Sequence, residues 1–148
     1  QKVFAMNRPD VVLQTQVEAP EIELPGVRAF LGRGPRGPAP GPTQPARVRQ
    51  LYALAGLDAK AGEVVVKVVN PTPAAVPAAV ALKGLSKLGS QAKVITLAHA
   101  DANAENTLDN PNVIVPVESQ MPVTGAEFPV TFSANSLTVL RLAATVEQ

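Results

Sequence analysis

The chain contains no cysteine and no tryptophan, and it has little aromatic surface of any kind. Without cysteine there are no disulfides, no thiolate metal ligands and no cysteine nucleophile. Only 3% of the 148 residues are aromatic, with a single tyrosine. Because nucleic-acid and sugar platforms usually stack bases or rings on aromatic faces, this composition argues against both kinds of binding module.

The chain also lacks an excess of charge and a long hydrophobic run. Thirteen basic and twelve acidic residues give a net charge of +1, too little to steer DNA or an anionic membrane. The longest apolar stretches, such as VIVPV at 113–117, are far shorter than the roughly 20 residues of a membrane helix. We therefore expect no nucleic-acid partner and no membrane partner. Since the chain starts at Gln1 with no visible signal peptide, we expect a processed protein or a piece of a longer one.

Short β-branched runs dominate the chain after residue 46. They are bounded by Gly, Pro, Asn and Asp and recur about every 10–15 residues, as strands of a sandwich do. The runs are RVRQLYALAGLD, VVVKVVN, AAVALKGL, AKVITLAHA, VIVPVES, FPVTFS and SLTVLRLAA. No amphipathic stretch is long enough for a crossover helix. The pattern predicts an all-β fold, an antiparallel, jelly-roll-like β-sandwich.

Two segments precede this body and differ from it. Residues 1–18 hold two short apolar runs around the turn NRPD at 7–10, so we expect a connection and a first strand there. Residues 20–45 contain seven prolines and five glycines, which excludes a helix interior or a central strand. The expected division is therefore a connection at 1–18, a surface loop or insertion at 19–45, and the sandwich body at 46–148.

One short pattern matches a chemical motif by letter but lacks the context that the chemistry needs, and two other motifs are not met. GRGPRG at 32–37 has the dinucleotide-binding spacing, yet Pro35 and the prolines after it exclude the helix whose amides would hold a pyrophosphate. NPT at 70–72 has proline in the position that excludes N-glycosylation. The serines lie in no GxSxG motif. We therefore interpret 32–37 as part of a surface loop.

The polar segment ENTLDNP at 105–111 is the strongest candidate for a site. His99 lies near three carboxylates that could hold a metal with it, namely Asp101, Glu105 and Asp109. Their spacing matches no standard ligand motif, and the glycine of a calcium loop is missing. We expect no metal and no cofactor, and a His99 that ends a strand and hydrogen-bonds into the loop.

Glu105 and Glu118 could form the carboxylate pair of glycoside hydrolysis. Their neighbours are small and aliphatic, whereas an acid–base pair needs a cleft with substrate contacts. We expect instead a structural loop whose side chains satisfy backbone amides, and which docks on a partner. The residues of this structural and interface loop are Asn103, Glu105, Asn106, Asp109, Asn110 and Glu118. We assign no catalytic residue, and the substrate-binding residues stay unassigned.

Several segments resemble the C-terminal sandwich of family 51 α-L-arabinofuranosidases. These are GEVVVKVVNPTPAAV, AKVITLAHADANAENTLDNPNVIVPVES and FPVTFSANSLTVLRL, in which the matching positions are 67–70, 103–111, 115–118 and 136–142. The opening QKVFAMNRPDVVLQT is similar to the segment that leaves the last barrel helix of that family. It departs from the family at Pro9, where glycine is usual. Residues 20–45 match no family motif.

The resemblance implies a non-catalytic domain of a retaining glycoside hydrolase that releases terminal arabinofuranosyl groups from arabinan or arabinoxylan. Family members carry two catalytic glutamates on an upstream (β/α)8 barrel, so neither is carried over to this chain. The implied partners are that barrel, as a domain or a separate chain, a homo-oligomer of the full enzyme, and an arabinose-containing polysaccharide bound through the barrel. KVFAM would then be a short helical tail of the barrel.

The resemblance implies an extracellular or periplasmic location and leaves the cytoplasm open. Two other functions also remain open. One is an independent carbohydrate-binding module, which the shortage of aromatic residues disfavours. The other is a structural or subunit-contact sandwich with no carbohydrate role.

Overall fold

The computed structural model describes residues 2–24, 45–101 and 103–146, which are almost entirely β-structure. The one helix of this part is α1 (Lys2–Met6). The strands are β1 (Val11–Leu13), β2 (Glu21–Leu24), β3 (Ala46–Arg49), β4 (Tyr52–Asp58), β5 (Glu63–Asn70), β6 (Val76–Ala81), β7 (Leu85–Ala98), β8 (Val117–Pro122), β9 (Glu127–Phe132) and β10 (Ser136–Val146). The all-β prediction is confirmed, and KVFAM is helical.

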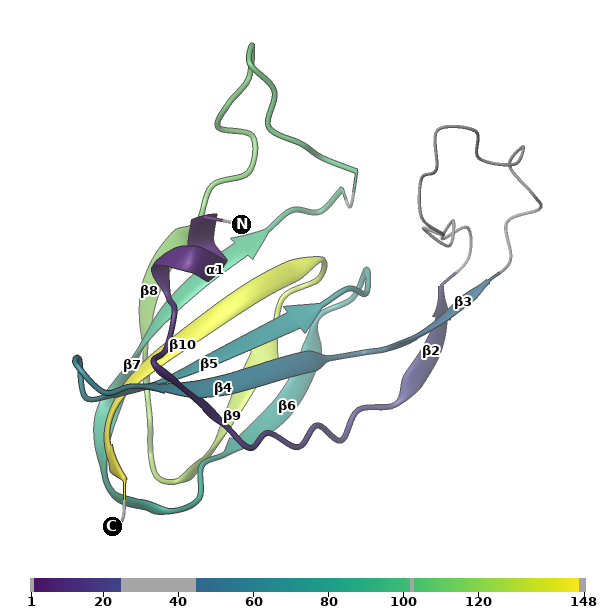
Figure 1. The fold of residues 1–148 in the computed structure, drawn as a ribbon. Coiled ribbons are helices and arrows are strands. Elements are labelled where there is room, and N and C mark those ends of the chain that lie inside the picture. The colour runs from purple at the N-terminus through teal and green to yellow at the C-terminus, as the bar shows by residue number, and fades with distance from the viewer. Residues whose placement is uncertain (1, 25–44, 102, 147–148) are drawn as a thin grey trace, which may run out of the picture.

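The strands form two packed layers and a projecting ribbon (Figure 1). A six-stranded antiparallel sheet has the order β1-β4-β5-β10-β7-β8, and the pair β6-β9 forms the second layer. The pair β2-β3 is a separate two-stranded ribbon. Long-range pairing of β10 with both β5 and β7 brings the end of the chain to the centre of the sheet.

The main core lies between the two layers. Its largest buried side chains include Phe128 and Phe132 of β9 and Leu140 and Leu142 of β10, each almost fully removed from solvent. Burial of one such side chain stabilises the fold by about 1.5–3 kcal/mol. This packing accounts for the alternating pattern of β9, in which every second residue faces the core.

The opposite face of the large sheet is partly covered by α1. Val3 of the helix packs with Val65, Ile95 and Val139, which belong to β5, β7 and β10. The middle of β5 is therefore buried on both faces, and this explains the run VVVKVV better than a simple alternation does. We call this side of the sheet the outer face.

Three strand boundaries differ from the sequence-based expectation. RVRQLYALAGLD forms two strands, because β3 ends before Gln50 and β4 starts at Tyr52. AAVALKGL is interrupted by Gly84, whose φ of 72° lies in the left-handed region that favours glycine. VIVPVES becomes a strand only at Val117, since the residues before it belong to a long loop.

Part of the expected loop or insertion at 19–45 is a strand. β2 pairs with β3 as a ribbon, so the proline-rich region does contribute strand pairing, although at the margin of the fold. Residues 25–44, which include GRGPRG at 32–37, lie outside the described residues. The division into 1–18, 19–45 and 46–148 stays a prediction.

Candidate interface site

The polar segment lies in the loop between β7 and β8, which projects beyond the end of the large sheet (Figure 1). The Asn106 side chain pairs with the backbone of Ile114 at both of its polar atoms: Nδ2 donates to the carbonyl oxygen at 2.8 Å, and Oδ1 accepts from the amide at 2.7 Å. The side-chain amide thus makes the two hydrogen bonds that a paired strand would otherwise make with the Ile114 backbone. Between these positions, the Thr107 backbone amide donates to the Asn110 backbone carbonyl oxygen at 3.1 Å, and the Asn110 backbone amide donates to Thr107 Oγ1 at 3.0 Å.

The beginning of this loop is held by His99, as the sequence predicts. The Asp101 amide donates to His99 Nδ1 at 3.1 Å, and the Asn103 amide donates to Asp101 Oδ1 at 2.9 Å. Among the residues that the structure describes, no group of three His, Cys, Asp or Glu side chains is placed to hold a metal ion. The loop is therefore organised by its own hydrogen bonds.

The six residues predicted to form the structural and interface loop are all exposed. They are Asn103, Glu105, Asn106, Asp109, Asn110 and Glu118. Glu118 lies on β8 and pairs with Lys93 at 2.9 Å on the surface. Of their other side chains, that of Asn106 bonds the loop backbone and that of Asn103 bonds Asp101 Oδ1 at 3.4 Å. A role in satisfying backbone amides is therefore seen at Asn106 and stays a prediction for the others. A carboxylate pair at Glu105 and Glu118 has no support from the structure.

The sequence reasoning did not identify a second polar cluster, which holds α1 on the outer face. Lys67 of β5 is 4% exposed, and its Nζ donates to the Phe4 carbonyl oxygen at 2.9 Å. The same ammonium lies 3.7 Å from the centre of the Phe4 ring, a cation–π contact. Burial, and after it the charge of Arg141, lowers the pKa of Lys67.

Arg141 completes this cluster from β10. Its Nε donates to Glu63 Oε2 and its Nη2 to Asp58 Oδ2, both at 2.7 Å, and its Nη1 reaches Asn7 Oδ1 at 3.3 Å. Asn7 in turn donates to the Val3 carbonyl oxygen at 2.9 Å and so ends α1. Burial alone would lower the pKa of Arg141, but the hydrogen bonds to the two carboxylates raise it above its usual value.

We call Phe4, Asn7, Lys67 and Arg141 the helix clasp. Its members come from segments far apart in the chain, and all of them lie in stretches that the family resemblance had singled out. A signal was present in the sequence, because Lys67 and Arg141 interrupt strand runs that are otherwise apolar. A charged side chain on a buried strand needs a hydrogen-bond or ion-pair partner, although the fold decides which residue that partner is.

Beside the clasp, the outer face carries an apolar row that the helix covers at most in part. Tyr52, Val69, Leu137 and Leu97 lie directly opposite one another on β4, β5, β10 and β7. Tyr52 is 47% exposed and Val69 39%, and both leucines are half-buried. We call these four residues the outer row. They lie one residue from the sheet end at which the β7–β8 loop begins.

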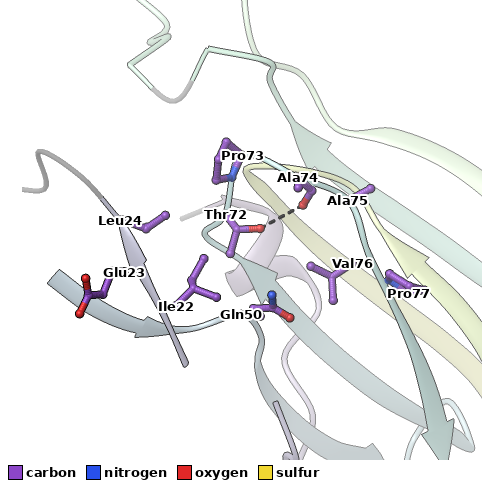
Figure 2. A pocket seen from close by; sticks show the side chains of 10 residues that line it. All are labelled: Ile22, Glu23, Leu24, Gln50, Thr72, Pro73, Ala74, Ala75, Val76 and Pro77. Atoms are coloured by element: carbon purple, nitrogen blue, oxygen red, sulfur yellow. Dashed lines mark hydrogen bonds between the residues drawn. The ribbon is translucent and has the colours of Figure 1, made fainter. Parts of the chain in front are cut away.

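A shallow hollow lies apart from these features, between the β2–β3 ribbon and residues 72–77 (Figure 2). Its volume is about 350 Å³, and Ile22 and Leu24 form much of the ribbon side. The Thr72 hydroxyl at its edge already bonds Asn70 Oδ1 at 2.7 Å and the Ala74 carbonyl oxygen at 3.0 Å. The Thr72 hydroxyl is therefore already engaged within the protein.

No helix of the described residues is long and apolar enough to span a bilayer.

Comparison with known proteins matches these features to one family. The family described as the α-L-arabinofuranosidase C-terminal domain matches residues 1–136. An extracellular exo-α-L-arabinofuranosidase of Streptomyces chartreusis is 44% identical over 86 residues, which are 57% of this chain and 10% of that protein.

Solved structures agree with this match. The thermostable GH51 α-L-arabinofuranosidase of Thermotoga petrophila RKU-1 is similar with a TM-score of 0.70 and 26% identity, over 95% of this chain and 27% of its own. The α-L-arabinofuranosidase of Thermotoga maritima in its arabinose complex is similar with a TM-score of 0.72 and 25% identity, over 95% of this chain and 27% of its own. The chain thus spans about a tenth to a quarter of the length of these relatives. With its sandwich fold and the match over 136 residues, the chain belongs to the α-L-arabinofuranosidase C-terminal domain family.

Proposed function

We propose that this chain is the non-catalytic accessory domain of an α-L-arabinofuranosidase, and that it packs against the catalytic domain and stabilises it. The relatives are enzymes of which this domain is only a part, and the family is described as their C-terminal domain. The remainder of such a protein would therefore precede residue 1. The two catalytic glutamates would belong to that remainder, a (β/α)8 barrel by the resemblance.

The outer row is the observation that carries this proposal. Four adjacent strands present apolar side chains in register on a face that α1 covers only in part. Contiguous apolar surface of this kind marks a contact with another protein surface, because its burial is favourable. A domain that enters through α1 would arrive over this face, since the helix clasp fixes α1 on it.

The activity proposed for the complete protein is retaining hydrolysis of terminal arabinofuranosyl groups from arabinan or arabinoxylan. One carboxyl of the catalytic domain would protonate the leaving oxygen while the other forms the glycosyl-enzyme. This chain would contribute no reacting group. An extracellular location is supported by the name of the Streptomyces relative. A homo-oligomer of the full enzyme is a further proposal, supported by the resemblance alone.

The test is native mass spectrometry of the source material, combined with a chromogenic α-L-arabinofuranoside assay. We expect the domain to be found in a polypeptide or complex much larger than 15.4 kDa, and arabinofuranosidase activity to follow it through purification. A folded 15.4 kDa chain that travels alone, with the activity in other fractions, would contradict the proposal. Arabinan binding by such a solitary chain would favour a carbohydrate-binding module instead.

A further inference from the structure

The β7–β8 loop carries its apolar side chains outward, which is the reverse of the usual arrangement. Leu108 at its tip is fully exposed, and three valines on the returning segment are also exposed, namely Val113, Val115 and Val117. The polar side chains of Asn106 and Thr107 instead bond the loop backbone. We call residues 105–117 the arm.

The arm has a defined shape before any partner arrives. Asn106 joins its two sides by the paired hydrogen bonds to Ile114, and Thr107 and Asn110 close the turn around Leu108. A preorganised loop loses little conformational entropy when it binds, so exposed apolar groups on it favour association. Isolated exposed apolar residues need no explanation, but a leucine and three valines gathered on one projecting loop do.

The charged residues of the arm itself, Glu105 and Asp109, are both acidic. Asp101, Glu105, Asp109 and Glu118 lie in or beside it, and no lysine or arginine occurs between Lys93 and Arg141. Of these four carboxylates, Glu118 pairs with Lys93. A complementary surface would therefore be apolar at its centre and would carry lysine or arginine at its rim.

We propose that the arm is a docking element that inserts Leu108 into an apolar hollow with a basic rim on the catalytic domain, and that Asn106 is the residue that positions it. This rests on the proposed function above. The arm leaves the sheet at the end of β7, next to Leu97 of the outer row, and α1 packs on Ile95 of the same strand. The arm therefore starts at the sheet end beside the outer row, where one partner surface would meet both.

The experiment compares variants of the complete enzyme, which carries this domain together with its catalytic domain. Leu108→Asp removes the apolar tip, and Asn106→Ala unlocks the arm but keeps its apolar side chains. Val146→Asp is the matched control, because Val146 is an exposed apolar residue at the far end of β10. The readouts are the rate of irreversible loss of arabinofuranosidase activity on heating, the activity at low temperature, and the sedimentation coefficient.

We expect Leu108→Asp to speed thermal inactivation several-fold, and Asn106→Ala to do so to a smaller extent, with unchanged activity at low temperature. Val146→Asp should behave as the parent enzyme does. Raised salt should also weaken the contact, and Asp109→Lys should act in the same direction as Leu108→Asp, because the proposed rim is basic.

Tyr52→Asp, at the most exposed position of the outer row, separates the two proposals. If Tyr52→Asp speeds inactivation and Leu108→Asp does not, the arm proposal is overturned while the accessory-domain proposal stands. If Leu108→Asp changes only the sedimentation coefficient, the arm contacts a second copy rather than the catalytic domain, and the inference is again overturned. Absence of arabinofuranosidase activity from the complete protein would instead overturn the proposed function.

Discussion

The Lys67 ammonium contacts Phe4 in two ways at once, donating to its carbonyl oxygen at 2.9 Å and lying 3.7 Å from the centre of its ring. This contact joins the centre of the large sheet to the short helix at the start of the chain. α1 has only five residues, and a helix of that length is not stable on its own. Its position on the outer face therefore depends on side-chain contacts of this kind.

Lys67→Met should release α1 without unfolding the sandwich. Methionine keeps the stem of the side chain but removes the hydrogen bond and the cation–π contact. Because burial lowers the pKa of Lys67, the charged form carries a cost that the substitution removes, so we expect the free energy of unfolding to change by less than about 1 kcal/mol. The measurement is NMR of the Val3 methyl groups, whose shifts should move toward those of an unstructured chain. Lys60→Met, at an exposed lysine, is the control; native Val3 shifts in Lys67→Met would show that the clasp does not hold the helix.

Stability should fall in acid partly because of Asp58. The Ala61 amide, which donates to Oδ1 at 3.0 Å, and next the Arg141 guanidinium hold the pKa of this carboxyl below its ordinary value of 3.8. A carboxyl whose pKa is lower in the folded state stabilises the fold above its unfolded pKa, and this contribution is lost as the pH falls below about 4. Asp58→Asn should flatten that part of the curve.

Urea unfolding at a series of pH values between about 6 and 2 measures this effect. Asp109→Asn, at an exposed loop carboxylate, provides the comparison and should retain the parental acid dependence. If Asp58→Asn and the parent chain lose the same free energy of unfolding as the pH falls, Asp58 does not contribute to the acid dependence.

Asn70→Asp should destabilise the sandwich strongly. Asn70 is almost fully buried, and its Nδ2 donates to the carbonyl oxygens of Ala74 and Ser133, both at 2.8 Å, while Oδ1 accepts from the Thr72 amide at 3.0 Å. A carboxylate has the same shape but would face those carbonyl oxygens without a proton to donate. We expect a loss of roughly 2–5 kcal/mol in the free energy of unfolding. The urea concentration at the midpoint of unfolding measures this loss, with Asn103→Asp on the exposed loop as the control. Equal midpoints for the two variants would refute the prediction.

Gly56→Ala should disturb the junction between β1 and β4. A Cβ at this position would overlap the Pro9 ring and lie 2.7 Å from the Val11 carbonyl oxygen. We expect a loss of about 1–3 kcal/mol, and Gly125→Ala, where nothing lies within 4 Å, should be close to neutral. Adding Pro9→Gly should recover part of the loss, because the overlapping ring is removed. Additive effects of the two changes in thermal unfolding would show that Pro9 and Gly56 are not coupled.

Much of this fold could be predicted from local sequence, because strands and turns leave local signals. The run around Val66 and the run around Val139 are β-branched or leucine-rich, and both are central strands of the sheet. The start of β8 could not be predicted in this way. Residues 113–116 look like a strand, but Asn106 holds the Ile114 backbone in the loop, and such pairing across eight positions leaves no periodic pattern.

The candidate site was harder to predict because its contacts are long-range. Lys67 and Arg141 stand out as charges within apolar runs, yet their partners at Phe4 and Asn7 are more than 60 positions away in the sequence. The polar residues of the loop are visible in the sequence, whereas nothing there marks the exposed apolar tip at Leu108. A single leucine among polar residues gives no sign of whether it is buried, and only the folded chain shows that it is exposed.

The central claim is that the catalytic domain covers the outer row, and thiol labelling tests it most directly. Since the chain has no cysteine, Tyr52→Cys introduces a single reactive site on the row within this domain, and Lys83→Cys introduces one at an exposed turn beyond β6. Both are made in the complete enzyme, and the rate of maleimide labelling is measured at the peptide level under native conditions. We predict that Tyr52→Cys labels much more slowly than Lys83→Cys, although Tyr52 is 47% exposed in this chain. Equal labelling rates at the two positions would show that the outer row is open to solvent in the enzyme, and would contradict the account.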